Sequence, residues 1–390
     1  MSIAQFPQKH SATGTTIFTV MSALAQQYNA INLSQGFPDF HIDEQLSRLL
    51  GEAASTGHNQ YAPMPGLPIL RHAIAANFKQ RYGLDIDADH EITVTPGATY
   101  AIYTAFTTIL QAGDEAIVLE PAYDSYIPNI EMNGARAVTV SLTAPDFHVD
   151  WNRIKDAITP RTKAIILNTP HNPTGAIWDK KDWDQLAELV RGTGIIILSD
   201  EVYEQLVFDG AKHYSVLEHS ELRERSFALY SFGKVFNNTG CKIGYCIAPP
   251  AFTQAFRKIH QFLSFTVNTP GQYALAHHLG HDTTPVGKIM ERKRDHFLSL
   301  MKETLFTIHK AAKGSYFQIA GYDRISNLPD MEFAQMLTKE YGVATIPVSA
   351  FYRDKKDDKL IRFCFAKKEE TLNEAVERLK RLTPALSAAK

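Results

Sequence analysis

Residues 94–250 alternate between short apolar runs and longer amphipathic segments, and this pattern constrains the fold more than any other feature of the chain. In the segment 98–110, for example, apolar side chains recur at the three- and four-residue spacing of a helix with one buried face. Such alternation is typical of an α/β fold in which helices cover both faces of a mostly parallel sheet. The strands expected on this basis are 116–119, 137–140, 164–167, 194–198, 227–230 and 245–248.

The first forty residues predict an arm rather than a complete domain. They contain one apolar-periodic segment, 17–24, and they end in a stretch where Gly36 and Pro38 interrupt regular structure. We therefore assign residues 1–40 to an N-terminal arm that forms part of a small domain.

The last third of the chain predicts the rest of that small domain. Residues 276–288 are rich in His, Thr, Gly and Pro, which indicates a domain boundary. Further on, a strand over 360–365 precedes a helix that begins near Lys368. We expect a large domain over residues 41–275 and a small α+β domain over residues 276–390.

The charge balance and the cysteine count exclude several classes of function. The chain has 40 Lys and Arg against 42 Asp and Glu, so it has no broad attraction for nucleic acid or anionic membranes. Its longest aliphatic run, 195–198, is too short to span a membrane, and the N-terminus lacks the apolar core of a signal peptide. Cys241, Cys246 and Cys364 form neither a CxxC pair nor a metal-ligand pattern. We expect a cytoplasmic protein that binds no metal.

Polar residues follow the predicted strands directly. The segment HNPTG (171–175) comes after the third strand, Asp200 after the fourth, and Ser231 and Lys234 after the fifth. In open α/β sheets, ligands bind outside the carboxyl ends of the strands. The sequence therefore predicts a ligand site at this edge of the sheet.

Two glycine-containing segments predict the chemistry of that ligand. The segment TPGAT places Gly97 where a helix begins, and the free N–H groups at a helix start bind anions. Ser231 can add a hydroxyl group and Lys242 a point charge. Lys234 lies eight residues before Lys242, in the segment SFGKVFNNTGCKIGY (231–245), where a flexible amine could reach a carbonyl group. Together these features predict an anion site next to a reactive amine.

Eight short motifs follow one another along nearly the whole chain. They are SQGFPDF (34–40), QYAPMPG (60–66), TPGAT (95–99), PAYDSY (121–126), NTPHNPTG (168–175), SDEVYE (199–204), SFGKVFNNTGCKIGY (231–245) and IRFCF (361–365). In content and order they resemble the class I, fold-type I aminotransferases, and bacterial methionine aminotransferases most closely. The kynurenine and glutamine-transaminase-K group comes next. The resemblance implies a large domain with a mostly parallel seven-stranded sheet flanked by helices, and a small α+β domain.

The resemblance also implies pyridoxal 5′-phosphate as the cofactor and assigns its contacts. Lys234 should hold the cofactor as a Schiff base and then transfer protons, which requires an amine of lowered pKa. Asp200 should pair with the protonated ring nitrogen, and Tyr203 completes the implied catalytic set. The other implied contacts are Gly97, Ala98, Thr99, Tyr123, Asn172, Ser231, Lys242 and, across a homodimer with shared active sites, Tyr61.

The substrate contacts follow from the same resemblance. Arg362 should bind the α-carboxylate, assisted by Asn172 and the backbone at Gly36, because a guanidinium group matches a carboxylate bidentately. Phe18, Tyr61, Tyr123 and Phe265 match positions of the side-chain pocket, and all four are aromatic. An aromatic lining favours methionine and aromatic amino acids over aspartate. We expect a ping-pong transfer of the amino group to a 2-oxo acid.

Other functions stay open on the sequence alone. A kynurenine or glutamine transaminase, or a cysteine-S-conjugate β-lyase, would use the same scaffold and cofactor. An aminotransferase-like sensor domain of a transcription regulator would need a DNA-binding module, for which the match from about residue 14 leaves no room. Taken singly, Asp200 also fits a helix cap and Arg362 a surface ion pair.

Two positions depart from the family pattern. Cys241 stands where a large residue usually precedes the phosphate-binding lysine, and Val235 replaces a common threonine after Lys234. The lysine itself, Lys242, is retained, so the phosphate site is still expected.

Overall fold

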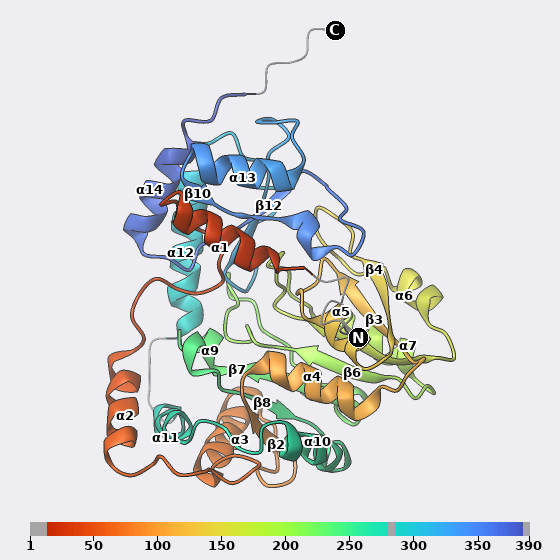
Figure 1. Cartoon of the computed structure of the whole chain (residues 1–390). Helices are drawn as coiled ribbons and strands as arrows, with labels where there is room; N and C mark the ends of the chain where they lie inside the picture. The colour runs from red at the N-terminus through yellow and green to blue at the C-terminus, as the bar shows by residue number, and fades with distance from the viewer. Residues whose placement is uncertain (1–13, 280–284, 385–390) are drawn as a thin grey trace, which may run out of the picture.

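The computed structural model describes residues 14–279 and 285–384, and its centre is a seven-stranded sheet (Figure 1). The strand order is β2-β8-β7-β6-β5-β3-β4. β8 runs antiparallel to β2 and β7, and the other neighbours are parallel. The strands are β2 (Ile92–Thr95), β3 (Glu115–Glu120), β4 (Arg136–Ser141), β5 (Thr162–Asn168), β6 (Ile196–Asp200), β7 (Ser226–Ser231) and β8 (Gly244–Ile247). This confirms the mostly parallel α/β sheet and all six predicted strands; β2 was not among them.

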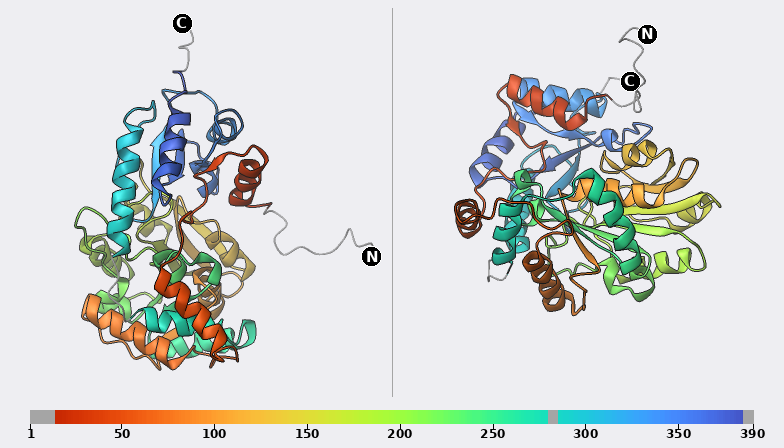
Figure 2. Two further views of the ribbon diagram at one scale, coloured as in Figure 1. Left: turned by 90° about the vertical axis from the view of Figure 1, so that its left-hand side faces the viewer. Right: turned by 60° about the horizontal axis from the view of Figure 1, so that its bottom comes forward.

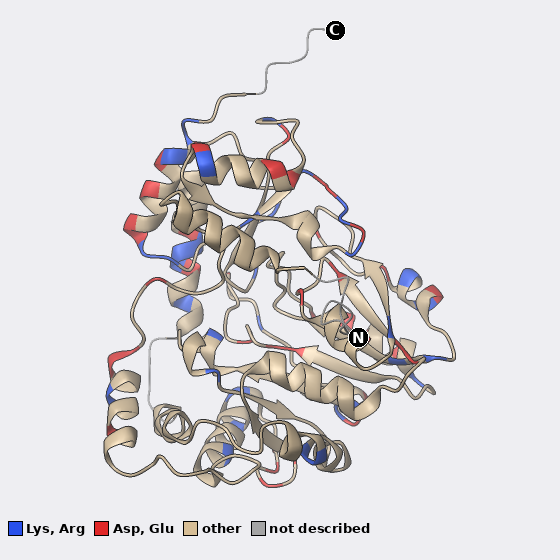
Figure 3. Ribbon diagram, viewed as in Figure 1, with Lys and Arg blue, Asp and Glu red and all other residues tan. Residues whose placement is uncertain are grey.

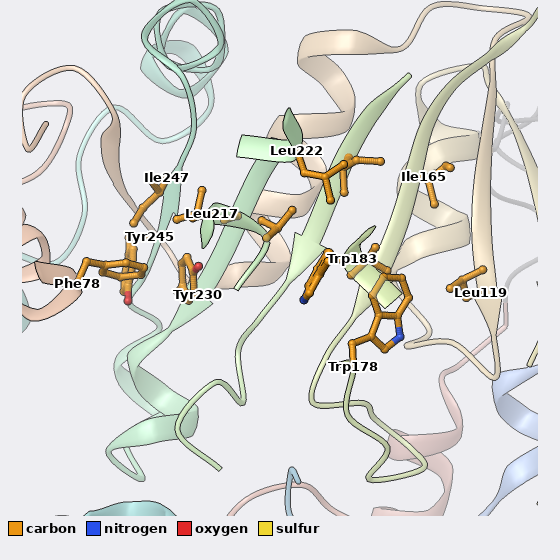
Figure 4. Packing of buried hydrophobic residues seen from close by; sticks show 14 of the residues in the cluster. Phe78, Leu119, Ile165, Trp178, Trp183, Leu217, Leu222, Tyr230, Tyr245 and Ile247 are labelled. Atoms are coloured by element: carbon orange, nitrogen blue, oxygen red, sulfur yellow. The ribbon is translucent and has the colours of Figure 1, made fainter. Parts of the chain in front are cut away.

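The central strands are buried on both faces, which explains their continuous apolar runs. Successive residues of a strand point to opposite faces. Ile165 accordingly joins the cluster that contains Trp178 and Trp183 (Figure 4), whereas Ile166 packs with Phe106 on the other side. The sheet therefore separates two apolar cores.

Helices cover both faces of this sheet (Figures 1 and 2). Side chains of α4, α5 and α10 form one apolar core, and side chains of α2, α3, α6, α7, α8 and α11 contribute to the other. The helices are α2 (Glu44–Ser55), α3 (Pro68–Tyr82), α4 (Ala98–Ile109), α5 (Tyr126–Met132), α6 (Trp151–Ala157), α7 (Lys180–Val190), α8 (Ser220–Arg223), α9 (Phe232–Val235), α10 (Pro250–Leu263) and α11 (Thr269–His278). The predicted helix 98–110 is α4.

The C-terminal part of the chain builds two small sheets that also recruit the N-terminal arm. β9 (Phe317–Gly321), β11 (Ile346–Pro347) and β12 (Leu360–Cys364) form an antiparallel sheet in the order β11-β12-β9. β1 (Ile31–Asn32) pairs in parallel with β10 (Val343–Ala344). The arm thus adds a strand to an element more than 300 residues further along the chain.

Four helices pack around these small sheets. They are α1 (Ile17–Gln27), α12 (Val286–Met301), α13 (Asp330–Glu340) and α14 (Glu369–Leu379). Met21 of α1 packs against Ala334 of α13, so the predicted apolar segment 17–24 is a helix that joins this core. Basic and acidic residues are interspersed along α12 (Figure 3). α14 is mainly acidic, because it carries Glu369, Glu370, Glu374 and Glu377 and one basic residue, Arg378.

The predicted boundary segment, 276–288, begins within α11 and ends within α12. Residues 280–284 lie outside the described part of the chain, so the division at residue 275 stays a prediction. No helix among residues 14–279 and 285–384 has the length and apolarity that a bilayer crossing requires.

Candidate active site

A cavity of about 450 Å³ lies at the carboxyl ends of β5, β6 and β7. Its walls also include the start of α4, the arm before β2, and residues of β9 and β12. The predicted site residues that line it are Phe18, Gly36, Gly97, Ala98, Thr99, Tyr123, Asn172, Asp200, Tyr203, Ser231, Lys234, Lys242 and Arg362. Segments from distant parts of the sequence thus meet where the topology of an α/β sheet places ligands.

Lys234 extends into this cavity from α9, the short helix that follows β7. Its Nζ donates a hydrogen bond to the carbonyl of Gly36 at 3.3 Å and lies 5.9 Å from the ring centroids of Tyr203 and Tyr316. Burial lowers the pKa of the Lys234 amine to about 8. An appreciable neutral fraction therefore exists near neutral pH, as a nucleophile or proton carrier requires.

Asp200 ends β6 and is buried at the floor of the cavity. Tyr126 donates a hydrogen bond to its Oδ2 at 2.5 Å, and the N–H of Val202 donates to Oδ1 at 3.3 Å. Burial raises the pKa of Asp200 to about 6, although these hydrogen bonds and nearby Lys234 act in the opposite direction. A buried carboxylate in this state is stabilised by a cationic partner.

The start of α4 forms an anion cradle with Lys242. Gly97 has a φ of +83°, and no side chain in the described part of the chain caps the helix. A positive φ favours glycine, and a Cβ atom at Gly97 would lie 3.2 Å from Nζ of Lys242, which is tighter than most Cβ contacts. Ser231 lines the same cavity and carries a hydroxyl group. Free helix N–H groups, a hydroxyl and an ammonium group together fit a phosphate.

Arg362 of β12 is fully buried and lines the same cavity. Its Nη1 donates to Oδ1 of Asn172 at 2.7 Å and its Nη2 to the carbonyl of Ser34 at 2.6 Å. The guanidinium carbon lies 3.9 Å from the ring centroid of Phe317. Nε has no hydrogen-bond partner among the described residues. Burial lowers the pKa of Arg362 to about 10, so the group stays cationic at neutral pH and can bind a carboxylate.

Comparison with known proteins identifies the family. The family described as Aminotransferase class I and II matches residues 28–379. The chain belongs to this family. Methionine aminotransferase of Escherichia coli K12 is 47% identical over 372 residues, which cover 95% of this chain and 96% of that protein. A probable N-succinyldiaminopimelate aminotransferase of Mycobacterium tuberculosis is 38% identical, with 94% and 95% covered. Mouse kynurenine–oxoglutarate transaminase 1 is 34% identical, with 91% and 92% covered.

A solved structure supports the same assignment. The crystal structure of Escherichia coli YbdL, whose reactivity identified a methionine aminotransferase function, superposes with a TM-score of 0.94 at 47% identity. The match covers 97% of this chain and 100% of that one. This match confirms the fold-type I architecture that the motifs predicted, and it confirms that the protein is a transferase.

Class I aminotransferases use pyridoxal 5′-phosphate, and the cavity of this aminotransferase fits that cofactor. The cradle between Gly97 and Lys242 suits its phosphate, and buried Asp200 suits its ring nitrogen. Lys234 provides an amine for its aldehyde. Among the described residues, no group of three or more His, Cys, Asp or Glu side chains is arranged to hold a metal ion.

Two predicted site residues lie outside the cavity of their own chain. Tyr61 is 80% exposed and Phe265 is 47% exposed, and their rings form an edge contact with centroids 5.9 Å apart. Neither lines the cavity. Any contact of these side chains with a cofactor or substrate requires a second subunit, so their predicted roles stay predictions.

The structure also adds residues that the sequence analysis did not single out. Tyr126 contacts Asp200 directly, Phe317 packs on Arg362, and Tyr316 donates to the carbonyl of Gly36 at 2.7 Å. Tyr126 ends the motif PAYDSY, so its position carried a usable signal. Tyr316 and Phe317 lie outside the eight motifs, and only the fold brings them to the cavity.

Proposed function

We propose that this aminotransferase moves the amino group of methionine and of aromatic amino acids to a 2-oxo acid by a ping-pong mechanism. One observation carries the proposal: the amine of Lys234, the carboxylate of Asp200 and the guanidinium group of Arg362 line one cavity. These three groups are what the cofactor and an amino-acid carboxylate need. The 47% identity to a methionine aminotransferase supports methionine as a donor.

The cofactor contacts follow from the cavity. Lys234 would hold the aldehyde carbon, Asp200 would pair with the ring nitrogen, and Tyr123 would pack on the ring. When bound, pyridoxal phosphate supplies an electron sink for the bond broken at the substrate α-carbon. Tyr203 and Asn172 would donate to the ring oxygen. The phosphate would be held by Gly97, Ala98, Thr99, Ser231 and Lys242.

The chain's own residues then do three things. Arg362 binds the substrate α-carboxylate, with Asn172 and the backbone of Gly36 completing the carboxylate site. Lys234 Nζ accepts the proton from the substrate α-carbon and returns it, because its pKa of about 8 lies near the working pH. Asp200 stays ionised next to the ring nitrogen because Tyr126 and the N–H of Val202 donate to it.

The side-chain specificity rests on aromatic groups. Phe18 lies 6.4 Å from Tyr123 and 6.0 Å from Phe351 between ring centroids, and its ring centroid lies 5.3 Å from the guanidinium carbon of Arg362. Such rings favour thioether and aromatic side chains. The 34% identity to a kynurenine–oxoglutarate transaminase supports kynurenine-type amino acids as a second donor class.

We also propose a homodimer with shared active sites. Several large apolar side chains are exposed on one chain, including Tyr61 at 80%, Phe262 at 85% and Phe265 at 47%. Exposed apolar side chains of this size are typical of surfaces that a partner covers. In the dimer, Tyr61 would reach the partner's phosphate site and Phe265 its side-chain pocket. The cytoplasmic location stays a prediction.

The test uses the purified enzyme loaded with pyridoxal phosphate. Methionine should bleach the visible absorption of the bound cofactor, and a 2-oxo acid should then restore it. An unchanged spectrum with cofactor bound would contradict the aminotransferase reaction. Pyruvate and ammonia released from cystathionine without any 2-oxo acid would favour a β-lyase instead. A donor panel of methionine, phenylalanine, glutamine, kynurenine and aspartate against one 2-oxo acid ranks the substrates by kcat/KM.

A further inference from the structure

A second cavity, of about 250 Å³, lies beyond the turn that carries Asn172. We call it the rear cavity. It is lined by residues 145–149, residues 174–178, residues 309–311 and the side chains of Asp182, Lys313, Ile319 and Leu360. Among the described residues, none lines both this cavity and the active-site cavity. The rear cavity is therefore a separate compartment, and nothing in the proposed reaction uses it.

The rear cavity is lined by charges of both signs. Lys310 and Asp146 form an ion pair at 3.2 Å, but their side chains are 52% and 55% exposed, so a ligand can replace either partner at little cost. Asp182 of α7 accepts a hydrogen bond from the N–H of Asp179 at 2.9 Å, and it forms no ion pair within the described part of the chain. Burial raises the pKa of Asp182. A carboxylate and an ammonium group of the protein are thus both available to a ligand.

Apolar side chains line the same cavity as these charges. Ile177, Trp178, Ile319 and Leu360 line the cavity together with the polar groups. A zwitterion with an apolar side chain matches all three features, since its ammonium group suits Asp182, its carboxylate suits Lys310, and its side chain suits the apolar surface. An α-amino acid with an aliphatic or aromatic side chain has this chemistry.

The turn formed by residues 172–175 lines one side of the rear cavity and also contacts Arg362. Gly175 accepts hydrogen bonds from the N–H groups of Lys313 at 2.8 Å and Gly314 at 3.0 Å. A Cβ atom at Gly175 would lie 2.5 Å from the Cβ of Ala312, so the turn is packed tightly against this segment. Asn172, three residues earlier in the same turn, accepts the hydrogen bond from Arg362.

Strands β9 and β12, which line another side of the rear cavity, also hold neighbours of Arg362. Ile319 of β9 is the direct cross-strand neighbour of Arg362, and Leu360 precedes Arg362 by two residues on β12. Residues at these positions share one face of a sheet. A ligand in the rear cavity would therefore contact two elements that each hold a neighbour of Arg362.

We propose that the rear cavity binds a second amino-acid zwitterion with an apolar side chain, and that its occupancy is transmitted to Arg362. Binding itself does not depend on the proposed reaction. The effect on turnover does, because it rests on Arg362 as the substrate carboxylate site.

The tryptophans of the protein report on this cavity. The chain contains three, and they form one cluster: Trp178 lies 5.5 Å from Trp151 and 4.9 Å from Trp183 between ring centroids. Figure 4 shows Trp178 next to Trp183. Because Trp178 lines the rear cavity, a bound ligand changes the tryptophan emission directly.

The experiment titrates the holoenzyme with α-methylphenylalanine, a zwitterion that lacks the α-hydrogen and cannot undergo transamination. We expect a saturable change in tryptophan emission. D182N should raise the Kd about tenfold or more, because it removes the charge that would pair with the ammonium group of the ligand. The Asn oxygen can still accept from the N–H of Asp179, so the start of α7 is preserved. The matched control is D184N on the same helix, where the carboxylate is 54% exposed and lies 3.5 Å from His219.

Two further arms separate the outcomes. R362Q should abolish the response of cofactor absorption to the probe while the emission change persists. At saturating methionine, the probe should lower kcat in the wild type and D184N but not in D182N. Three results would rule out the binding site: the probe leaves the tryptophan emission unchanged, D182N and D184N give the same Kd, or the emission change disappears in R362Q. A saturable emission change with unaltered kcat disproves the transmission to Arg362. If methionine gives no turnover at all, the proposed function fails and the titration still decides the binding site.

Discussion

The Tyr126 hydroxyl donates a hydrogen bond to Oδ2 of Asp200 over 2.5 Å, and both side chains are buried. Among the influences that lower the pKa of Asp200, this hydrogen bond is the largest. It opposes the effect of burial, which raises that pKa to about 6. Tyr126 is therefore positioned to keep Asp200 ionised, and an ionised Asp200 is what a protonated ring nitrogen requires.

Removing the Tyr126 hydroxyl should weaken cofactor binding at mildly acidic pH. In Y126F the pKa of Asp200 should rise by roughly one to two pH units, since a hydrogen bond to a charged group is worth about 1.5–3 kcal/mol. The pH below which the Kd for pyridoxal phosphate begins to rise should therefore move upward. The measurement titrates the cofactor-free protein with pyridoxal phosphate between pH 5 and pH 8, because the pKa of Asp200 is about 6. Y100F is the control, because Tyr100 bonds His260 Nδ1 at 2.9 Å, outside the cavity. Equal profiles for the two variants would contradict the role of Tyr126.

Replacing Arg362 by lysine keeps the positive charge but should still strongly impair substrate binding. The guanidinium group bonds Asn172 and Ser34 and stacks on Phe317, and an ammonium group cannot make these contacts together. We expect R362K to lower kcat/KM for amino and oxo acids about 100-fold, in line with the loss of about 3 kcal/mol of charged hydrogen bonds. The Kd for pyridoxal phosphate should stay within a few-fold of the wild-type value. A larger loss of cofactor than of substrate affinity would place Arg362 in a different role.

Removing the Lys234 amine should stabilise the cofactor-free protein. Its pKa is lowered from 10.5 to about 8 in the folded state, so folding buries a charge below pH 8. K234M should raise the free energy of unfolding by roughly 1–3 kcal/mol at pH 7, measured by urea denaturation. Wild-type stability should increase relative to K234M as the pH rises from about 8 to 10.5, because the unfolded chain then binds more protons than the folded one. A K234M protein less stable than the wild type at pH 7 would refute this account.

Truncating Phe18 should change the choice of amino donor. Its ring lies beside Tyr123 and Phe351 and 5.3 Å from the Arg362 guanidinium carbon. F18A should lower kcat/KM for methionine and phenylalanine by a factor that corresponds to about 1.5–3 kcal/mol, which is the value of burying one such side chain. The kcat/KM for alanine should fall less. The methionine-to-alanine ratio isolates side-chain recognition from any effect on Arg362. An unchanged ratio would remove Phe18 from the substrate pocket.

Mixing two inactive variants tests the shared active site. A heterodimer of K234A and Y61A contains one cavity with both Lys234 and Tyr61 if Tyr61 reaches across the interface. Activity of the mixture at limiting cofactor should therefore exceed the sum of the separate activities. The control pair is K234A with D200N, since Lys234 and Asp200 line the cavity of the same chain and no intact site can form. No gain from the first pair, or an equal gain from both, would argue against a shared site.

Much of this site was predictable because its residues lie at the ends of regular elements. Asp200 and Ser231 end β6 and β7, so apolar periodicity placed them at one sheet edge, and Gly97 was expected at the start of the helix that is α4. β2 was missed because a four-residue run with two threonines carries little periodic signal. Its place at the sheet edge depends on pairing with β8, about 150 residues further along the chain.

The sequence by itself determined which elements form and which chemical groups stand at their ends, because helix and strand periodicity and motif spacing act over short stretches of chain. Only the tertiary structure decided that Arg362 bonds Asn172, 190 residues away, and that Tyr126 holds Asp200. It also decided that Tyr61 and Phe265 lie outside their own cavity. Such pairs depend on how packed sheets and helices bring distant segments together, and no local pattern encodes that distance.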